Sequence, residues 1–361
     1  MRKLRNLAVA IVAPALVACG SSSDTSGTEE PAEHFKGEKV TIIVPFGAGG
    51  GADVAARLLA PFLSEELPGK PTVIIENKEG GGGALAMNDV VQAPADALTM
   101  VVITPGTQAR WLTGEEGHDY PLPDFHALAG VLGSGITFTT KSTADSLEDL
   151  IARSQTEPWV TGNSNRDSGP SLIEKNAAEL LGLKLKQTFG YGGYGEVALA
   201  MLRGEIEGSS MSAGAFTSSF GPIKKKIGGY TNLFQQGVVG EDGNIDRSEF
   251  FKDVPTIAEA YEEVNGKPLE GEELELHRGL ILLNTLQQLY IVAPKTPDTY
   301  VTALREAFSK ALNNPEFLAK ATDAYGGSID VLDGAVAQDQ LKEVTSMPDQ
   351  VKQYIIDSAE E

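Results

Sequence analysis

Apolar residues along the chain form short β-branched runs that alternate with helical stripes. Residues 39–44, 72–76 and 100–103 are such runs, which are typical of buried strands. Between the first two, residues 53–67 place their Val, Leu and Phe side chains on one helix face. Pro61 is expected to kink this helix, because proline lacks a backbone donor. Strand, helix and strand in this order predict a parallel sheet with right-handed crossovers.

A second set of alternating elements begins after about residue 140. The pattern predicts a strand at residues 159–161 and helices at residues 147–153, 171–181, 196–203 and 298–312. No exact repeat relates the two sets. Roughly 325 residues follow the N-terminal region, a length that favours two globular lobes within one chain.

The N-terminus has the pattern of an export signal. Arg2, Lys3 and Arg5 precede an apolar stretch at residues 7–18, which ends directly before Cys19, the only cysteine of the chain. The stretch is too short to span a bilayer, and its end resembles the lipobox of bacterial lipoproteins. We expect a signal peptide at residues 1–18 and a lipid anchor on Cys19. An ordinary signal peptide with a chance cysteine is the alternative.

The segment after Cys19 is polar and rich in Ser, Gly, Thr and acidic residues. Such a segment has nothing apolar to bury, so its ordering entropy is not offset. We expect residues 19–35 to be a flexible tether and the fold to start near Phe35. The protein is then expected in the periplasm or cell envelope, held to a membrane by its lipid.

Composition narrows the classes of partner. Hydrophobic residues make up 41% of the chain, which is enough for real cores, and the formal net charge is −21. Nucleic-acid binding needs a basic surface, so it is disfavoured. A site for an anion must be built locally in such an acidic chain, from backbone dipoles or a few selected side chains.

The main candidate for such a site is the glycine-rich loop PFGAGGGAD at residues 45–53, between a predicted strand and a predicted helix. Glycine lets a ligand approach the backbone, and a helix start offers unpaired N–H donors. The spacing of Gly47, Gly49 and Ala52, with Glu76 after the next strand, also fits a dinucleotide fingerprint. Nicotinamide cofactors are absent outside the cytoplasm, so this alternative is disfavoured. A glycine turn without a ligand is the other alternative.

Signatures of catalysis and of metal binding are missing from the sequence. There is no G-x-S-x-G, no H-E-x-x-H and no ligand spacing among the four histidines. Residues 242–248 faintly resemble a calcium loop, but Arg247 occupies the position that needs glycine, so an acidic surface turn is preferred. We expect no enzyme activity, no cofactor and no bound metal.

Several motifs together resemble the receptors of tripartite tricarboxylate transporters, also called Bug proteins. The loop at residues 45–53 is similar to the family's Pro-Phe-x-x-Gly-Gly-x-x-Asp, and ENKEGGGG at residues 76–83 is similar to its Glu-Asn-x-Pro-Gly-x-Gly-Gly. Further similarities follow in the family's order, in ADALT (95–99), YGG (191–193), GEIE (204–207), DVPT (253–256) and APKTP (293–297). The resemblance covers nearly the whole chain after the tether.

Some positions depart from the family pattern. They are Glu79, Ala95, Ala97, Leu98, Gly190, Gly192 and extra residues around 266–289. A lysine of the family is lost at Gly192, which makes a tricarboxylate a poor candidate in so acidic a chain.

The resemblance implies a type II periplasmic-binding-protein-like fold. It has two α/β lobes, each a mostly parallel sheet flanked by helices, which close over the ligand like a hinge. We expect lobe one at residues 36–138 plus about 255–361, and lobe two at residues 139–254. The implied partners are a small organic carboxylate and the integral membrane permease subunits of the transporter, and the protein is expected to be a monomer.

The family fold also implies where the ligand lies, between two glycine-flanked helix starts at residues 48–53 and 193–196. We expect Phe46 and Tyr194 to wall the cavity, hydroxyl groups to complete it, and Asp53 either to cap its helix or to bind an ammonium group of the ligand. The expected ligand-binding residues are Phe46, Ala48, Gly49, Gly50, Asp53, Thr104, Thr107, Ser164, Ser168, Gly193 and Tyr194.

Two classes of function remain open from the sequence. The favoured one is a solute-binding receptor that delivers its ligand to a permease. The alternative is a receptor of the same fold that signals to a membrane sensor.

Overall fold

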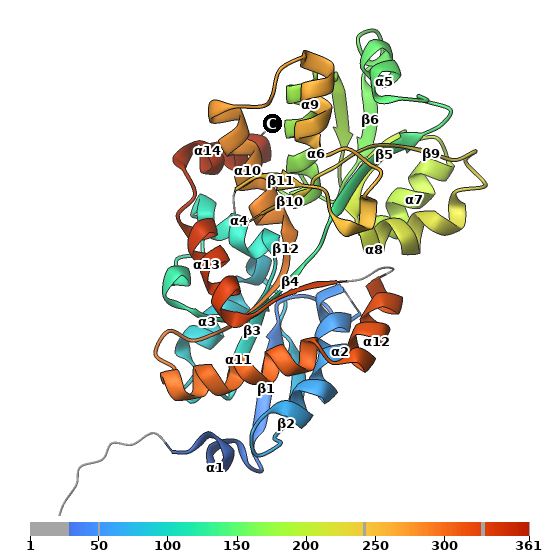
Figure 1. Ribbon diagram of the computed structural model, residues 1–361. Helices are drawn as coiled ribbons and strands as arrows, with labels where there is room; N and C mark the ends of the chain where they lie inside the picture. Colours follow the sequence, from blue (N-terminus) through green and yellow to red (C-terminus); the bar gives the residue numbers. More distant parts are fainter. Residues whose placement is uncertain (1–28, 50, 241–242, 326–328, 361) are drawn as a thin grey trace, which may run out of the picture.

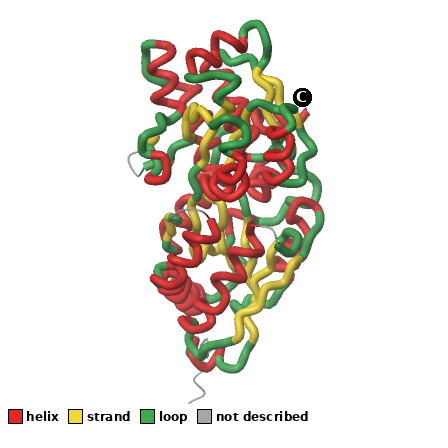
Figure 2. The backbone as a smooth tube through the Cα atoms, turned by 90° about the vertical axis from the view of Figure 1, so that its right-hand side faces the viewer, coloured by secondary structure: helices red, strands yellow, loops and turns green. Residues whose placement is uncertain are grey.

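The computed structural model describes residues 29–360, except 50, 241–242 and 326–328. Cys19, the signal peptide, most of the expected tether and Gly50 lie outside the described residues. The described chain forms two sheets with their helices, one in the lower and one in the upper half of Figure 1. Figure 2 shows the same two lobes stacked along the long axis of the molecule.

The sheet of the first lobe has six strands. Their order is β13 (Asp330–Leu332), β4 (His126–Leu132), β12 (Leu286–Val292), β3 (Thr99–Ile103), β1 (Lys39–Val44) and β2 (Thr72–Asn77). Strand β1 runs parallel to β2 and β3, with Val40 opposite Val73 and Ile42 opposite Met100. Strand β12 is antiparallel to both β3 and β4, and β13 is antiparallel to β4.

The sheet of the second lobe has five strands. Their order is β7 (Leu185–Thr188), β6 (Trp159–Gly162), β8 (Gly208–Ser212), β5 (Gly135–Thr140) and β9 (Tyr230–Gln235). Strand β6 is parallel to β7 and β8, whereas β5 is antiparallel to β8 and β9. A short hairpin, β10 (Val238–Val239) with β11 (Ile245–Asp246), follows β9.

The two-lobed α/β fold expected from the sequence is confirmed, but both sheets are mixed rather than mostly parallel. Parallel neighbours need a crossover within one sheet. Here the chain leaves the first sheet at the end of β4 and enters the second at β5, through residues 133–134. It returns where α10 (Gly271–Thr285) runs directly into β12. Strands β5 and β12 enter their sheets by these passages, which makes both antiparallel to their neighbours.

Helices cover both faces of the first sheet. Helix α2 (Gly51–Glu66) packs with α11 (Asp298–Leu312) and α12 (Pro315–Tyr325), and it continues through Pro61. On the other face, α3 (Ala84–Gln92) and α13 (Gly334–Thr345) bury apolar side chains against Ile43 and Val101. The amphipathic stripes of α2 and α11 therefore face one common core.

The second lobe is built around the buried Trp159, whose indole Nε1 donates a hydrogen bond to Thr139 Oγ1 at 3.2 Å. Helix α6 (Gly169–Leu181) packs against α9 (Ile257–Asn265) and α10, while α5 (Leu147–Ser154) and α7 (Tyr194–Leu202) complete the lobe. After β8 the chain forms short turns, α8 (Ala213–Ala215), η3 (Phe216–Phe220) and η4 (Gly221–Ile223); η5 (Glu249–Phe251) follows the hairpin.

The expected lobe boundaries differ from the sheets in three places. The boundary after residue 138 falls inside β5. The segment after residue 255 is divided, because α9, α10 and α14 (Asp349–Glu360) pack on the second-lobe side, with α14 also contacting α4 (Pro105–Thr113). The tether expected to reach residue 35 ends earlier, since α1 (Pro31–Phe35) buries Phe35 in the first core.

None of the helices in the described ranges has the length and apolar character needed to cross a membrane.

Candidate functional site

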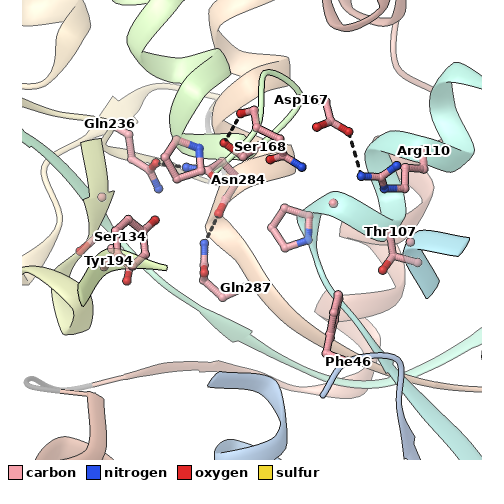
Figure 3. A pocket seen from close by; sticks show the side chains of 18 residues that line it. Phe46, Thr107, Arg110, Ser134, Asp167, Ser168, Tyr194, Gln236, Asn284 and Gln287 are labelled. Carbon is pink, nitrogen blue, oxygen red and sulfur yellow. Dashed lines mark hydrogen bonds and ion pairs between the residues drawn. The ribbon is translucent and has the colours of Figure 1, made fainter. Parts of the chain in front are cut away.

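Cavities lie between the two lobes. The central one has a volume of about 290 Å³ and is lined from the first lobe by Phe46 and Thr107, and from the second by Ser168 and Tyr194 (Figure 3). A second cavity of about 470 Å³ and a third of about 100 Å³ also include Tyr194 in their walls. The three cavities are thus adjacent, and together they form what we call the cleft.

Four helices of more than three residues begin at the cleft in the described part of the chain. The first residues of α2, α4, α6 and α7, which are Gly51, Pro105, Gly169 and Tyr194, each line at least one of the three cavities. A helix start carries unpaired N–H groups and the positive end of the helix dipole. The cleft is therefore attractive to an anion, although the protein as a whole is strongly acidic.

The four helix starts are not equivalent. In α2 and α7 a carboxylate in the first turn accepts a backbone hydrogen bond from the helix's own loop: Gly49 N–H donates to Asp53 Oδ2 at 2.8 Å, and Gly192 N–H donates to Glu196 Oε2 at 2.7 Å. Helices α4 and α6 have no acidic residue in their first turn, and the side chains of their N-cap residues make no capping hydrogen bond. The starts of α4 and α6 thus carry no carboxylate of their own, although Pro105 and Pro170 each lack an N–H donor, whereas the sequence pointed to the starts of α2 and α7.

Asp53 is a positioning residue rather than a ligand contact. Its side chain is buried, and besides Gly49 it accepts hydrogen bonds from Arg57 Nε (3.0 Å) and Asn77 Nδ2 (2.9 Å). Hydrogen bonding to Arg57 is the main cause that lowers the pKa of Asp53 to about 2. Asn77 Nδ2 also donates to the carbonyl oxygen of Phe46 (3.0 Å). Asp53 lines none of the three cavities, and its hydrogen bond from Gly49 N–H fits the first of its two expected roles, the capping of its own helix.

Two buried hydroxyls of the cleft have no hydrogen-bond partner within the described residues, those of Thr107 and Ser134. Only 1% and 4% of the surfaces of these residues are exposed, and both residues line the central cavity (Figure 3). A buried polar group without a partner costs free energy, so such groups need an explanation. A polar ligand in the central cavity would supply the missing partner.

The other hydroxyl residues expected at the site, Thr104, Ser164 and Ser168, also line the cleft, but two of their hydroxyls already have hydrogen-bond partners. Thr104 lines the second cavity. Ser168 lines the central cavity and its hydroxyl donates to the carbonyl oxygen of Asn165 at 2.9 Å, whereas Ser164 lines the third cavity and its hydroxyl donates to Asn165 Oδ1 at 3.1 Å. These side chains shape the loop between β6 and α6.

Of the expected glycine-loop residues, Gly49 lines the second cavity and Gly193 the third. Gly49 has φ +84°, a conformation that favours glycine. Ala48, another expected ligand-binding residue, is exposed and lines none of the three cavities. Gly50 lies outside the described residues.

The structure adds cleft residues that the sequence analysis missed. Several are carboxamides, and three of these are linked: Asn284 Nδ2 donates to Gln236 Oε1, and Gln287 Nε2 donates to the carbonyl oxygen of Asn284 at 2.5 Å. Two are charged, Arg110 and Asp167. The region of extra residues at 266–289 was the one signal for Asn284 and Gln287, because they fall within it.

The buried carboxyl group of Glu174 lies in the core of the second lobe, near enough to Tyr194 for its charge to affect the tyrosine. Glu174 accepts hydrogen bonds from Thr161, from Gln187 Nε2 (3.1 Å) and from Asn163 Nδ2 (3.3 Å), and burial raises its pKa to about 7. Burial, with the Glu174 charge as a second cause, raises the pKa of Tyr194. The Tyr194 hydroxyl therefore remains protonated and can donate to a ligand.

In the described part of the chain, no group of three or more His, Cys, Asp or Glu side chains gathers. Asp242 of the weighed calcium loop lies outside the described residues. Arg247 from that segment pairs with Glu259, its Nε 2.8 Å from Oε2.

Comparison with known sequences finds relatives that are named UPF0065 or Bug proteins. The UPF0065 protein in the gbd 5' region of Cupriavidus necator is 26% identical over 324 residues, which cover 88% of this chain and 87% of that protein. Protein BugT of Bordetella pertussis is 35% identical over 80 residues, or 22% of this chain, and the match spans about a quarter of BugT's length (24%). No model of a known protein family matches the chain.

Solved structures share the fold. A TctC solute-binding protein from Polaromonas has a TM-score of 0.66 at 20% identity, covering 89% of this chain and 98% of that one. The periplasmic binding protein BugD has a TM-score of 0.61 at 18% identity, with 89% and 97% covered. MatC from Rhodopseudomonas palustris, with bound malate, has a TM-score of 0.60 at 19% identity, with 88% and 99% covered.

Two of these solved structures are named as a solute-binding protein and a periplasmic binding protein, and the third holds malate. The motifs at residues 45–53 and 76–83 resemble those of Bug proteins. They therefore lie in a chain whose sequence relatives and fold resemble the same family. The sequence relatives and the solved structures together confirm the resemblance of this chain to the Bug/TctC family of periplasmic solute-binding proteins, whose two-lobed fold it shares.

Proposed function

We propose that the protein is an extracytoplasmic solute-binding receptor that holds a small organic carboxylate in the cleft. The ligand's carboxylate lies at the starts of α4 and α6, and the unpartnered hydroxyls of Thr107 and Ser134 hydrogen-bond to the ligand. Phe46 and Tyr194 wall the cavity from the two lobes. Contact with both lobes lets the ligand stabilise a closed arrangement.

The observation that carries this proposal is the pair of buried hydroxyls, Thr107 and Ser134, which find no partner among the described residues and line a cavity where α4 and α6 begin without a side-chain cap. A carboxylate accepts hydrogen bonds from both kinds of donor, and bonds to a charged acceptor are stronger than neutral ones. The malate bound in the similar MatC is a small carboxylate and supports the same class of ligand.

The proposal is tested by a thermal-shift screen with mono-, di- and tricarboxylates and amino acids, followed by calorimetric titration. A ligand that binds only the folded protein at 100 times its Kd stabilises it by about 2.7 kcal/mol. If no small carboxylate raises the melting temperature, the proposed function fails.

The variant Thr107→Val sharpens the test. The buried hydroxyl of Thr107 has no partner without ligand, so its removal should leave the ligand-free protein as stable or slightly more stable. Affinity should fall by about tenfold or more, since a hydrogen bond to a charged group contributes about 1.5–3 kcal/mol. Thr322→Val, at an exposed position of α12, is the matched control and should leave affinity unchanged. A Thr107→Val variant with full affinity would remove this hydroxyl from the site.

The lipid anchor on Cys19 and a location in the periplasm or cell envelope belong to this proposal. They are supported by the lipobox-like sequence before Cys19 and by the periplasmic location stated for BugD. Metabolic labelling with a fatty acid should mark the wild type and leave Cys19→Ser unlabelled. An unlabelled wild type that does not partition with membranes would contradict the anchor.

We further propose that the receptor delivers its ligand to integral membrane permease subunits. The resemblance to receptors of tripartite transporters supports this partner. Cells that lack the receptor should lose uptake of the radiolabelled ligand at low concentration, and the wild-type gene should restore it. Unchanged uptake, with a lost transcriptional response to the ligand, would favour a sensor instead.

A further inference from the structure

Two opposite charges face each other in the central cavity. Arg110, on α4, and Asp167, in the loop before α6, are the only charged side chains among the described residues that line the three cavities. Arg110 Nη2 lies 3.1 Å from Asp167 Oδ2, and the two side chains keep 24% and 22% of their surface exposed. Figure 3 shows the pair at one side of the cavity, with the Thr107 hydroxyl nearby. The pair is thus open to a ligand rather than sealed in a core.

The positive charge of Arg110 is already compensated from outside the cavity. Arg110 Nη1 lies 2.7 Å from both carboxylate oxygens of Glu115, which does not line the cavity. Together, Arg110, Asp167 and Glu115 carry one net negative charge. The described lining therefore offers an anion no spare cationic side chain, although the helix starts favour a carboxylate.

We propose that the physiological ligand is an α-amino acid bound as a zwitterion, an inference that rests on the proposed function. Its carboxylate lies at the start of α4 beside Arg110 and accepts from the hydroxyl of Thr107, which lies on the same side of the cavity in Figure 3. Its ammonium group binds Asp167. An α-amino acid carries its two charges on groups bonded to one carbon atom, which matches two opposite charges that are adjacent in the cavity.

Charge accounting favours the zwitterion over a dicarboxylate. When an amino acid inserts between Arg110 and Asp167, one ion pair is replaced by two, and the local net charge stays at one negative. A dicarboxylate that takes Arg110 from Asp167 leaves that carboxylate unpaired, and raises the local net charge to three negative. In a closing cleft with little water, an unpaired charge beside like charges is strongly unfavourable.

The carboxamides of Gln236, Asn284 and Gln287 extend the polar surface of the central cavity, whereas Val54, Val131 and Leu132 line the second cavity. An amino-acid side chain that passes from one to the other meets hydrogen-bonding groups first and apolar groups farther on.

The test compares amino acids with acids of the same carbon skeleton that lack the amine, such as glutamate with glutarate and leucine with 4-methylpentanoate. Calorimetric titration of the full chain is performed with the wild type, Asp167→Asn and Glu115→Gln, with circular dichroism and melting temperature as checks on folding. The best amino acid should bind the wild type at least tenfold more tightly than its deaminated counterpart. Asp167→Asn should lose at least tenfold in affinity for the amino acid and little for the counterpart. Glu115→Gln, which removes the charge that compensates Arg110 from outside the cavity, should strengthen binding of the deaminated acids and so reduce the preference.

Each other outcome has a distinct meaning. If deaminated acids bind as tightly as amino acids, or if Asp167→Asn weakens both classes equally, the pair is a contact between the lobes and the inference is overturned. If Asp167→Asn binds dicarboxylates more tightly than the wild type, Asp167 is displaced by an anion and the inference is also overturned. If neither class binds, the proposed function itself fails.

Discussion

The buried carboxylate of Asp53 holds the glycine loop of the first lobe, and its neutralisation by Asp53→Asn allows a quantitative prediction. The carboxylate accepts from Gly49 N–H and Asn77 Nδ2, and its Oδ1 lies 2.9 Å from Arg57 Nη2. The pKa of Asp53 is lowered from 3.8 to about 2 in the folded protein. The variant keeps the shape of the side chain and removes its charge.

The shift in pKa sets an upper bound on the loss of stability. A shift of this size corresponds to about 2.5 kcal/mol, at about 1.4 kcal/mol per pKa unit. Arg57 is half exposed, and water screens its charge, so we expect Asp53→Asn to lower the free energy of unfolding by about 1–2 kcal/mol at pH 7.

The sign of the pH dependence follows from the lowered pKa. The contribution of Asp53 is fully present above the unfolded pKa of 3.8 and is lost as the pH falls towards the folded pKa of about 2. The difference between wild type and Asp53→Asn should therefore be constant from pH 7 to pH 5, and at pH 3 it should shrink to about half.

Urea unfolding at pH 7, 5 and 3 measures this difference, with Glu196→Gln as the matched control. Glu196 accepts the equivalent hydrogen bond at the start of α7 but is exposed, so its substitution should change stability by less than about 0.5 kcal/mol. Equal stability of wild type and Asp53→Asn at pH 7, or a difference that grows as the pH falls, would refute the assigned role of Asp53.

Three further predictions concern packing, pH and closure. A Cβ at Gly208 would lie 2.3 Å from Trp159 Cζ2 and 2.7 Å from the carbonyl oxygen of Phe138, so Gly208→Ala should cost about 3 kcal/mol in urea unfolding. Gly195→Ala, whose Cβ meets open space in α7, should not destabilise; similar losses in both variants would argue against overpacking. Burial lowers the pKa of His277 to about 4, so its contribution to stability is present above pH 6.5 and is lost as the pH falls to 4. Over this range the free energy of unfolding of the wild type should fall by up to about 3 kcal/mol relative to His277→Gln. Parallel pH profiles of the two proteins would contradict this. Small-angle scattering should give a smaller radius of gyration at saturating ligand, whereas an unchanged profile would indicate a rigid site.

Local elements were largely predictable from the sequence, because their signals are local. The apolar stripe at residues 298–312 predicts α11 with its observed bounds, and the β-branched run at residues 39–44 predicts β1. The glycine loop was located correctly between β1 and α2. Periodicity and turn residues carry such information within a few residues of each element.

The arrangement of the strands was harder to predict. Strand β12 lies in the middle of the first sheet, between β3 and β4, although about 150 residues separate it from β4 in the sequence. Its run of apolar residues does not encode its neighbours. The mixed pairing of both sheets follows from where the chain passes between the lobes, which no local pattern records.

The charged and carboxamide side chains of the cleft were missed for a related reason. Arg110 and Asp167 come from two different elements, and neither has a sequence motif around it. Gln236 and Asn284 meet only because β9 and α10 pack near the same cavity. The sequence offered capping as one of two roles for Asp53, but it gave no sign that Glu196 accepts the equivalent hydrogen bond at the start of α7.

A crystal structure with the acid that gives the largest thermal shift would show whether the cleft is the binding site. We expect a carboxylate of the ligand to lie about 3 Å from backbone N–H groups in the first turns of α4 and α6, and polar atoms of the ligand to accept from the hydroxyls of Thr107 and Ser134. A ligand bound outside the cleft, or one in the cleft whose carboxylate points away from both helix starts, would contradict it.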